Sequence, residues 1–212
     1  MTKAPSSSPV DPQVNHHGAP RMLPGWTLEL SLPDDHAMNA PHRFAANPLV
    51  ESAIDYMIGL RIDAPWETNG KGQIIMNPPI GLVHAKRADR IGTAIKSKCP
   101  GWQVWAEVGL HTADGVKAPD LLAAAPGFEE SVDSRGFLLC APDMCVEVMS
   151  PSNSWEEMRH KALLYLAAGA KEVWVCDEAG ELHFFDGSGE RGESSIVTGM
   201  PKRVDSLDGE TR

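Results

Sequence analysis

One strand–helix–strand unit in the second half of the chain constrains the fold more than any other feature. Residues 144–149 form an apolar run that contains one carboxylate, Glu147, and a Ser-Pro break follows it. A helix is predicted over residues 154–168, with a serine as its cap and Gly169 as a left-handed stop. Residues 171–177 then form a second apolar strand. Two strands joined by a crossover helix predict an α/β chain with a mixed central sheet flanked by helices.

The remaining elements are predicted from hydrophobic periodicity and from turn residues. Helices are expected over residues 47–60 and 81–98. Further strands are expected at residues 72–77, 102–108, 116–125, 137–140, 182–186 and 194–198. The strands at 102–108 and 116–125 are predicted to pair through the turn Ala113-Asp114-Gly115.

The chain is predicted to hold one α/β domain, residues 47–200, between two tails. Residues 1–46 are rich in Pro, Ser, His and Asn, which is typical of a flexible tail, and one alternating apolar cluster, residues 26–32, could add an edge strand. Residues 201–212 are polar and form the second predicted tail.

No apolar run is long enough for a membrane span, and no apolar block follows Lys3, so we expect a cytoplasmic protein without a membrane partner. The 4 cysteines show no CxxC spacing. Disulfides stay an alternative, but reduced thiols are predicted for Cys99, Cys140, Cys145 and Cys176.

The charge balance weighs against a protein that grips many phosphates. The formal net charge is −10 at pH 7, whereas phosphate contacts normally need a basic surface. One predicted helix, residues 81–98, is basic, and its cations are Lys86, Arg87, Arg90, Lys96 and Lys98. They form either a solvated helix face or a wall that faces phosphates.

Three side chains from separate segments could form a site for phosphodiester hydrolysis. Glu147 stands in an apolar strand, Asp120 begins another apolar run, and Lys161 lies in the helix after Glu147. Two carboxylates can hold Mg²⁺, which lowers the pKa of its water and polarises a phosphoryl oxygen. The lysine could position or deprotonate the water, or stabilise the developing charge. Tyr165 lies one turn after Lys161, so both occupy one helix face, and Lys161 is expected at the edge of the buried stripe.

Each residue also has an ordinary structural explanation. Asp120 follows a proline and could be a turn or cap residue, and Glu147 could pair with a buried lysine or arginine. Lys161 alone could be a helix-surface lysine. Zinc is disfavoured because cysteines and histidines have no finger spacing, and Ser188 lies in a glycine-rich turn without the context of a nucleophile elbow.

Four segments together resemble one family. They are residues 66–79, Trp-Glu-Thr-Asn-Gly-Lys-Gly-Gln-Ile-Ile-Met-Asn-Pro-Pro; residues 118–121, Ala-Pro-Asp-Leu; residues 142–152, which begin Pro-Asp-Met-Cys-Val-Glu; and residues 161–177. In this order they are similar to a large bacterial family of restriction endonuclease-like proteins in the PD-(D/E)xK nuclease superfamily. The resemblance extends over residues 47–198 and implies a restriction endonuclease-like core.

The resemblance implies a role for each site residue. Asp120 matches the Asp of the PD element, and Glu147 matches the acid of the (D/E)xK element. The third position of that element is Met149, and the family supplies the lysine from the following helix, which matches Lys161. Glu67 matches an acid near the first helix, which would add a metal or water contact.

The function implied is an Mg²⁺- or Mn²⁺-dependent endonuclease that hydrolyses DNA phosphodiester bonds. Superfamily analogy predicts a homodimer, because cutting two strands needs two sites. The alternative is a non-catalytic nuclease-fold protein that serves as a binding or regulatory module, which the acidic charge and Met149 favour. A third hypothesis is a nuclease that needs a partner chain.

Overall fold

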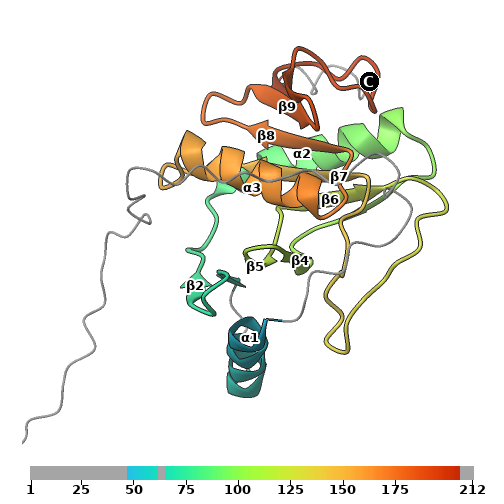
Figure 1. Ribbon diagram of the computed structural model, residues 1–212. Helices are drawn as coiled ribbons and strands as arrows, with labels where there is room; N and C mark the ends of the chain where they lie inside the picture. The colour runs from blue at the N-terminus through green and yellow to red at the C-terminus, as the bar shows by residue number, and fades with distance from the viewer. Residues whose placement is uncertain (1–46, 62–64, 206–212) are drawn as a thin grey trace, which may run out of the picture. The chain divides into compact units, whose positions relative to one another are not determined.

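The computed structural model describes residues 47–61 and 65–205, and all of them fall in one compact unit. The predicted tail 1–46, with its alternating apolar cluster, lies outside the described residues, as does most of the C-terminal tail. The described part is built on a six-stranded sheet with the order β10-β9-β8-β7-β6-β3 (Figure 1).

The predicted strand–helix–strand unit forms the centre of this sheet. Strands β7 (Met144–Val148) and β8 (Glu172–Cys176) pair in parallel, and α3 (Trp155–Ala167) is the crossover between them. Ser154 caps α3, because its hydroxyl accepts a hydrogen bond from the Glu157 amide. Gly169 follows the helix with a φ of 112°, a conformation that L side chains rarely adopt. Local sequence signals therefore predicted this unit correctly.

The other strands of the sheet pair antiparallel with their neighbours. They are β3 (Gln103–Trp105), β6 (Leu121–Ala124), β9 (Leu182–Asp186) and β10 (Gly189–Arg191). The sheet is mixed, as predicted.

Two short hairpins lie outside the main sheet. One consists of β1 (Trp66–Thr68) and β2 (Ile74–Met76), the other of β4 (Leu110–Thr112) and β5 (Gly115–Lys117). The prediction that the Ala113-Asp114-Gly115 turn joins residues 102–108 to 116–125 was wrong, because this turn joins β4 to β5. The chain leaves the sheet after β3, where Glu107 has a φ of 55°. It returns as β6, which does pair with β3.

Two predicted strands are replaced by irregular structure. Residues 137–140 form bridges only at Leu138. The segment 194–198 forms no strand, because the Ser194 hydroxyl accepts hydrogen bonds from the amides of Ile196 and Val197 and holds the chain in a turn. The last strand of the sheet is instead β10, which continues the β9 hairpin.

Helices α2 (Leu82–Lys98) and α3 cover opposite faces of the sheet (Figure 1). Ile91 and Ile95 of α2 belong to a core cluster with Val146 of β7. Cys145 of the same strand instead belongs to the cluster that contains Tyr165 of α3. This division follows from the alternation of side chains along a strand. All 4 cysteines are free thiols, as predicted.

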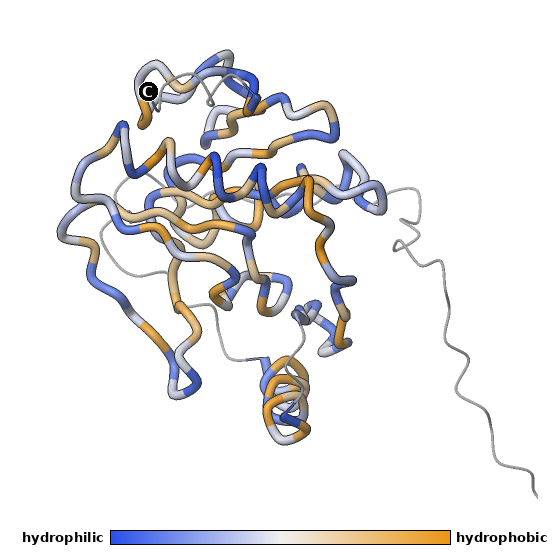
Figure 2. The backbone as a smooth tube through the Cα atoms, turned by 180° about the vertical axis from the view of Figure 1, so that it is seen from behind, coloured by the Kyte–Doolittle hydropathy of each residue, from blue (hydrophilic) through white to orange (hydrophobic). Residues whose placement is uncertain are grey.

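Helix α1 (Pro48–Leu60) precedes the β1–β2 hairpin and packs through Val50 and Ile54 on Val116 of β5. Hydrophobic and hydrophilic residues alternate around α1 (Figure 2). Within residues 47–61 and 65–205, no helix is long and apolar enough to cross a membrane.

Candidate active site

Glu147 is a buried carboxylate near the C-terminal end of β7, with 5% of its surface exposed. It lies two residues after Cys145, so its side chain faces α3. Two residues of α3, one turn apart, donate to the same oxygen of Glu147. The hydroxyl of Tyr165 lies 2.5 Å from Oε1, and the amine of Lys161 lies 3.3 Å from it.

Lys161 is held between two carboxylates. Its Nζ atom lies 2.9 Å from Oε1 of Glu67 and 3.3 Å from Oε1 of Glu147, and 12% of its side chain is exposed. Burial acts to lower the pKa of Lys161, but Glu147 and Glu67 outweigh it and raise the pKa above its ordinary value. Between these two carboxylates the amine is therefore a cation and a hydrogen-bond donor.

Glu67 reaches the site from β1, and 4% of it is exposed. Its Oε1 atom also accepts a hydrogen bond from the Ala118 amide at 3.3 Å. The β1–β2 hairpin, which carries Glu67, is attached to strand β5 by two hydrogen bonds at Thr68. The Val116 amide donates to the Thr68 hydroxyl at 2.9 Å, and the Lys117 amine donates to the Thr68 carbonyl at 2.8 Å.

Asp120 stands immediately before β6. The register of β6 on β7 pairs Leu121 with Val146, and its continuation places Asp120 beside Glu147. The Oδ2 atom of Asp120 accepts a hydrogen bond from the Val148 amide at 2.6 Å and lies 3.3 Å from Nε2 of His84. The structure therefore brings Asp120, Glu147, Lys161 and Glu67 together.

His84, in the first turn of α2, was missed by the sequence analysis. Its hydrogen bond with Asp120 raises its pKa, although burial opposes the shift. The Nδ1 atom is buried and has no hydrogen-bond partner among the described residues. The only sequence signal was one histidine near the start of the basic helix, and a single histidine in a helix usually has no functional role. The contribution of Tyr165 could be found because it shares a helix face with Lys161.

The electrostatics of the cluster favour a cation. Burial raises the pKa of Glu147 to about 7, and Asp120 and Glu67 also raise it, while Lys161 and the Tyr165 hydrogen bond lower it. Burial and Glu147 raise the pKa of Tyr165 well above its ordinary value, so Tyr165 stays a donor. The cluster holds three carboxylates and one ammonium group, so with all acids ionised the negative charge is in excess by two when His84 is neutral and by one when His84 is protonated.

The donor set fits a hard divalent cation. Oδ1 of Asp120 and Oε2 of Glu147 accept no hydrogen bond from the described residues, so each acid has one oxygen available. Mg²⁺ prefers oxygen ligands, takes few from the protein and keeps several waters. In the described part of the chain no three His, Cys, Asp or Glu side chains are placed to share one ion, so a protein cage of the zinc type is not formed there.

The basic helix α2 is partly engaged in structural contacts. Arg87 donates to the carbonyls of Asp177 and Glu178, and Arg90 pairs with Asp205 at 3.2 Å. Lys86 and Lys96 are exposed. The two arginines are therefore engaged in contacts within the protein, whereas both predictions, a solvated face and a phosphate-facing wall, remain predictions for the exposed Lys86 and Lys96.

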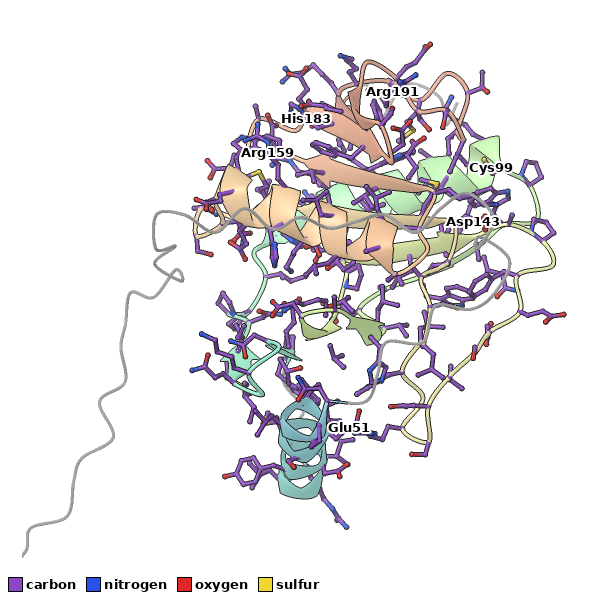
Figure 3. All side chains as sticks on the ribbon, in the orientation of Figure 1. Glu51, Cys99, Asp143, Arg159, His183 and Arg191 are labelled. Atoms are coloured by element: carbon purple, nitrogen blue, oxygen red, sulfur yellow. The ribbon has the colours of Figure 1, made fainter. Side chains whose placement is uncertain are left out.

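Other cations lie on the surface formed by α3, β9 and β10 (Figure 3). The guanidinium of Arg159 lies 5.5 Å from the centre of the Trp155 ring. His183 packs edge-on against the same Trp155 ring, and the two ring centres are 4.6 Å apart. Arg191 pairs with Asp186 at 3.5 Å. Arg159 and Arg191 are thus engaged by local partners, and these two cations do not form an open basic groove.

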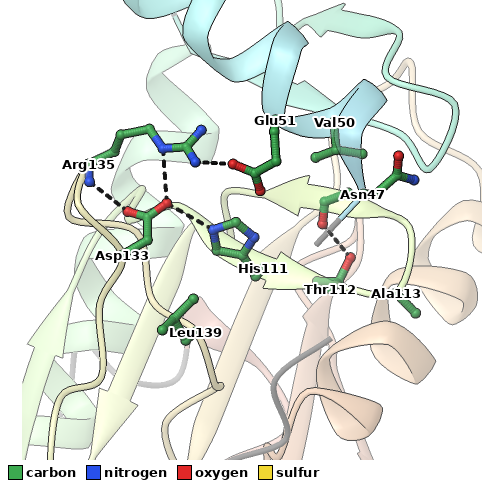
Figure 4. Close-up of a pocket in the computed structure, with 10 residues that line it drawn as sticks. Asn47, Val50, Glu51, His111, Thr112, Ala113, Asp133, Arg135 and Leu139 are labelled. Carbon is green, nitrogen blue, oxygen red and sulfur yellow. Dashed lines mark hydrogen bonds and ion pairs between the residues drawn. The ribbon is translucent and has the colours of Figure 1, made fainter. Parts of the chain in front are cut away.

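A separate cavity of about 430 Å³ is lined by residues of α1, of β4 and of the loop 133–139 (Figure 4). None of the four predicted site residues lines it. Asp133 accepts from His111 at 3.1 Å and from Arg135, which also pairs with Glu51 of α1. These polar groups satisfy one another and fasten α1 to the loop, so the cavity adds no reactive group to the site.

The fold and the site define a restriction endonuclease-like α/β protein. The chain belongs to the Uma2 family, described as "Putative restriction endonuclease", which matches residues 64–206. Among solved structures, the chain is similar to "a putative nuclease belonging to DUF820" from Anabaena variabilis ATCC 29413, with a TM-score of 0.57 and 18% identity over 71% of this chain and 95% of that one. At this identity the likeness concerns the fold. No protein with a curated description matches the chain.

Proposed function

We propose that this chain is an Mg²⁺- or Mn²⁺-dependent endonuclease that hydrolyses phosphodiester bonds of DNA. Asp120 and Glu147 would hold the ion, and Lys161 and Glu67 would complete the catalytic site. The observation that carries the proposal is the position of the Lys161 amine, which is held between Glu67 and Glu147, while Asp120 lies next to Glu147 in the strand register. Several acids and a single lysine, contributed by separate elements, suit phosphoryl transfer. A structural ion pair would need only one acid and one base.

Each residue has a distinct task in this proposal. The bound ion would activate a water molecule and polarise the phosphate. The Val148 amide and His84 orient Asp120, and Tyr165 orients Glu147, so that one oxygen of each acid stays available. The Lys161 ammonium can donate to a phosphoryl oxygen or hold the attacking water, and Glu67 keeps the ammonium in place.

The substrate assignment rests on the family description, and the charge of the chain restricts it. With a net charge of −10, the protein would contact few phosphates, so its affinity should depend weakly on salt. A homodimer would place two such sites on the two strands of a duplex.

Cleavage of plasmid and of single-stranded DNA by the purified full chain tests the proposal. We expect cleavage with Mg²⁺ or Mn²⁺, none with EDTA, and a loss of at least about a hundredfold in Asp120→Asn, Glu147→Gln and Lys161→Met. The matched control is Glu129→Gln, because Glu129 is exposed and lies outside the site. Cleavage that persists in both acid variants would overturn the assignment of the site.

The second candidate is a non-catalytic member of the fold that binds a partner. It is favoured by the acidic net charge and by the pairing of Lys161 with two carboxylates, which uses two of its three N–H donors. This candidate predicts that DNA stays intact with either ion. If cleavage appears only after a partner chain is added, the hypothesis of a nuclease that needs a partner chain is correct.

A further inference from the structure

The two donors of α3 occupy one oxygen of Glu147 and leave the other available. The Tyr165 hydroxyl is 2.5 Å and the Lys161 amine 3.3 Å from Oε1, while Oε2 accepts nothing from the described residues. The carboxylate therefore has one committed oxygen and one open oxygen.

The geometry resists rotation of this carboxylate. Tyr165 has no exposed surface and belongs to the cluster between α3 and the sheet, together with Met158 and Ala162 of the same helix. A phenol ring packed in this way cannot follow Glu147 to a new position without disturbing the core. The hydroxyl thus fixes where Oε1 lies.

This restriction bears on the kind of cation that the site accepts. Ca²⁺ takes about 6–8 oxygens and readily binds both oxygens of one carboxylate, whereas Mg²⁺ requires an octahedron at about 2.1 Å with few protein ligands. A Glu147 that offers only Oε2 suits the smaller ion. Without the Tyr165 hydroxyl, only the longer contact with Lys161, at 3.3 Å, would hold Oε1, and Glu147 could turn to bind the ion with both oxygens.

We propose that Tyr165 determines the cation specificity of the site, because its hydroxyl restricts Glu147 to one-oxygen binding and so favours Mg²⁺ or Mn²⁺ over Ca²⁺. This inference rests on the proposed metal site at Asp120 and Glu147. Tyr165 is a positioning residue, because it acts through Glu147 and contacts neither the ion nor the substrate.

The test is the variant Tyr165→Phe, which removes one oxygen atom from the core. Calorimetry without DNA would measure the dissociation constants of Mg²⁺ and Ca²⁺ for the full chain. We expect the preference for Mg²⁺ over Ca²⁺ to fall by about tenfold, the lower end of the change in metal affinity that follows removal of a residue that orients a ligand. The matched control is Tyr56→Phe, since Tyr56 is the only other tyrosine and is 60% exposed on α1.

A second measurement keeps the native core. In Tyr56→Phe, Tyr165 is the sole tyrosine, and resonance Raman spectroscopy would report whether its hydroxyl donates a hydrogen bond. We expect the spectrum of a tyrosine whose hydroxyl donates a hydrogen bond, both before and after Mg²⁺ is added.

The outcomes separate this inference from the proposed function. If the wild type binds Mg²⁺, Glu147→Gln abolishes binding, and Tyr165→Phe leaves the Mg²⁺/Ca²⁺ preference unchanged, the inference fails and the metal site stands. The inference about Tyr165 also fails if the Raman spectrum shows that the Tyr165 hydroxyl stops donating its hydrogen bond when Mg²⁺ is added. If the wild type binds neither ion, both proposals fail.

Discussion

The Nζ atom of Lys161 lies 2.9 Å from Oε1 of Glu67, although the two residues are 94 positions apart in the chain. The other carboxylate on this amine, Glu147, is only 14 positions away and belongs to the same strand–helix unit. Lys161 therefore links the central crossover unit to the β1–β2 hairpin. Predictions about the site follow from this link.

Lys161→Met should destabilise the fold, because it leaves two buried carboxylates without their cation. We expect a loss of about 3 kcal/mol in the free energy of unfolding near pH 8, the cost of breaking a buried pair. The pKa of Glu147 is about 7 with Lys161 present, and removal of this cation raises it further. Glu147 of the variant therefore takes up a proton as the pH falls from 8, and the loss should shrink by about pH 5.5. Urea unfolding at the two pH values measures this.

The control for this variant is Lys96→Met, since Lys96 is exposed on α2. An equal loss at both pH values would show that the cost is not electrostatic. Mg²⁺ should also stabilise Lys161→Met more than the wild type, because the excess negative charge is greater.

Gly115→Ala should displace the hairpin that carries Glu67. Gly115 has a φ of +86°, and a Cβ atom there would lie 2.6 Å from the Thr68 carbonyl oxygen. We expect a cost of about 2 kcal/mol or more, together with weaker cleavage, because Thr68 is next to Glu67. The comparison is Gly127→Ala, which has a similar φ of +91° but open space around it.

Both glycines have similar positive φ values, so the difference in thermal stability between the two variants reports mainly the contact with Thr68. If the two variants lose equal stability and keep equal activity, the close approach of the hairpin does not position Glu67.

Glu172→Ala should weaken the fold without altering the chemistry. Glu172 has no exposed surface, and it accepts hydrogen bonds from the Trp174 indole at 2.5 Å and from the Ser195 amide and hydroxyl at 2.9 and 2.8 Å. Its removal leaves these donors unpaired, at a cost of about 3 kcal/mol. Glu172 pairs with Met144, at the other end of β7 from Glu147, so activity well below the melting temperature should be unchanged.

Hydrogen exchange would check this variant, with faster exchange expected in the segment that Ser195 anchors. The exposed Glu193 gives a control, Glu193→Ala, for which no change is expected. A selective loss of cleavage in Glu172→Ala would contradict a purely structural role.

Asp133→Asn should show a pH-dependent cost. Burial acts to raise the pKa of Asp133, but hydrogen bonds from the Phe137 amide and from His111, and the charge of Arg135, outweigh it and lower the pKa below 3.8. A lowered pKa stabilises the fold above the ordinary value of 3.8, and this contribution is lost as the pH falls through the lower folded value.

The stability gap between wild type and Asp133→Asn should therefore be about 2 kcal/mol near neutral pH and should narrow below the ordinary carboxyl pKa. Urea unfolding across this range measures it, with the exposed Glu130→Gln as control. A gap that stays constant with pH would assign the cost to lost packing.

The parts of the fold that local signals determine could be predicted from the sequence. The cap at Ser154, the stop at Gly169 and two apolar runs were enough for the crossover unit. The edge position of Lys161 followed from helical periodicity, and its side chain is 12% exposed. The roles of the acids in metal binding stay predictions.

Long-range relationships could not be predicted in this way. Residues 102–125 contain two plausible strands and one clear turn, and nothing local shows that the turn belongs to a separate hairpin, β4–β5. The apolar residues Ile196 and Val197 look like a strand, yet turns also bring such residues to the core. His84 meets Asp120 through the packing of α2 on the sheet, and a spacing of 36 positions carries no periodic signal.

Glu67 reaches the cluster on a strand of three residues, β1, and this hairpin is attached to β5 by a few hydrogen bonds and one buried amine. Its detachment would leave the six-stranded sheet intact and would still remove one carboxylate from Lys161. Heat inactivation should therefore begin at temperatures where the bulk of the protein still gives a native circular dichroism spectrum.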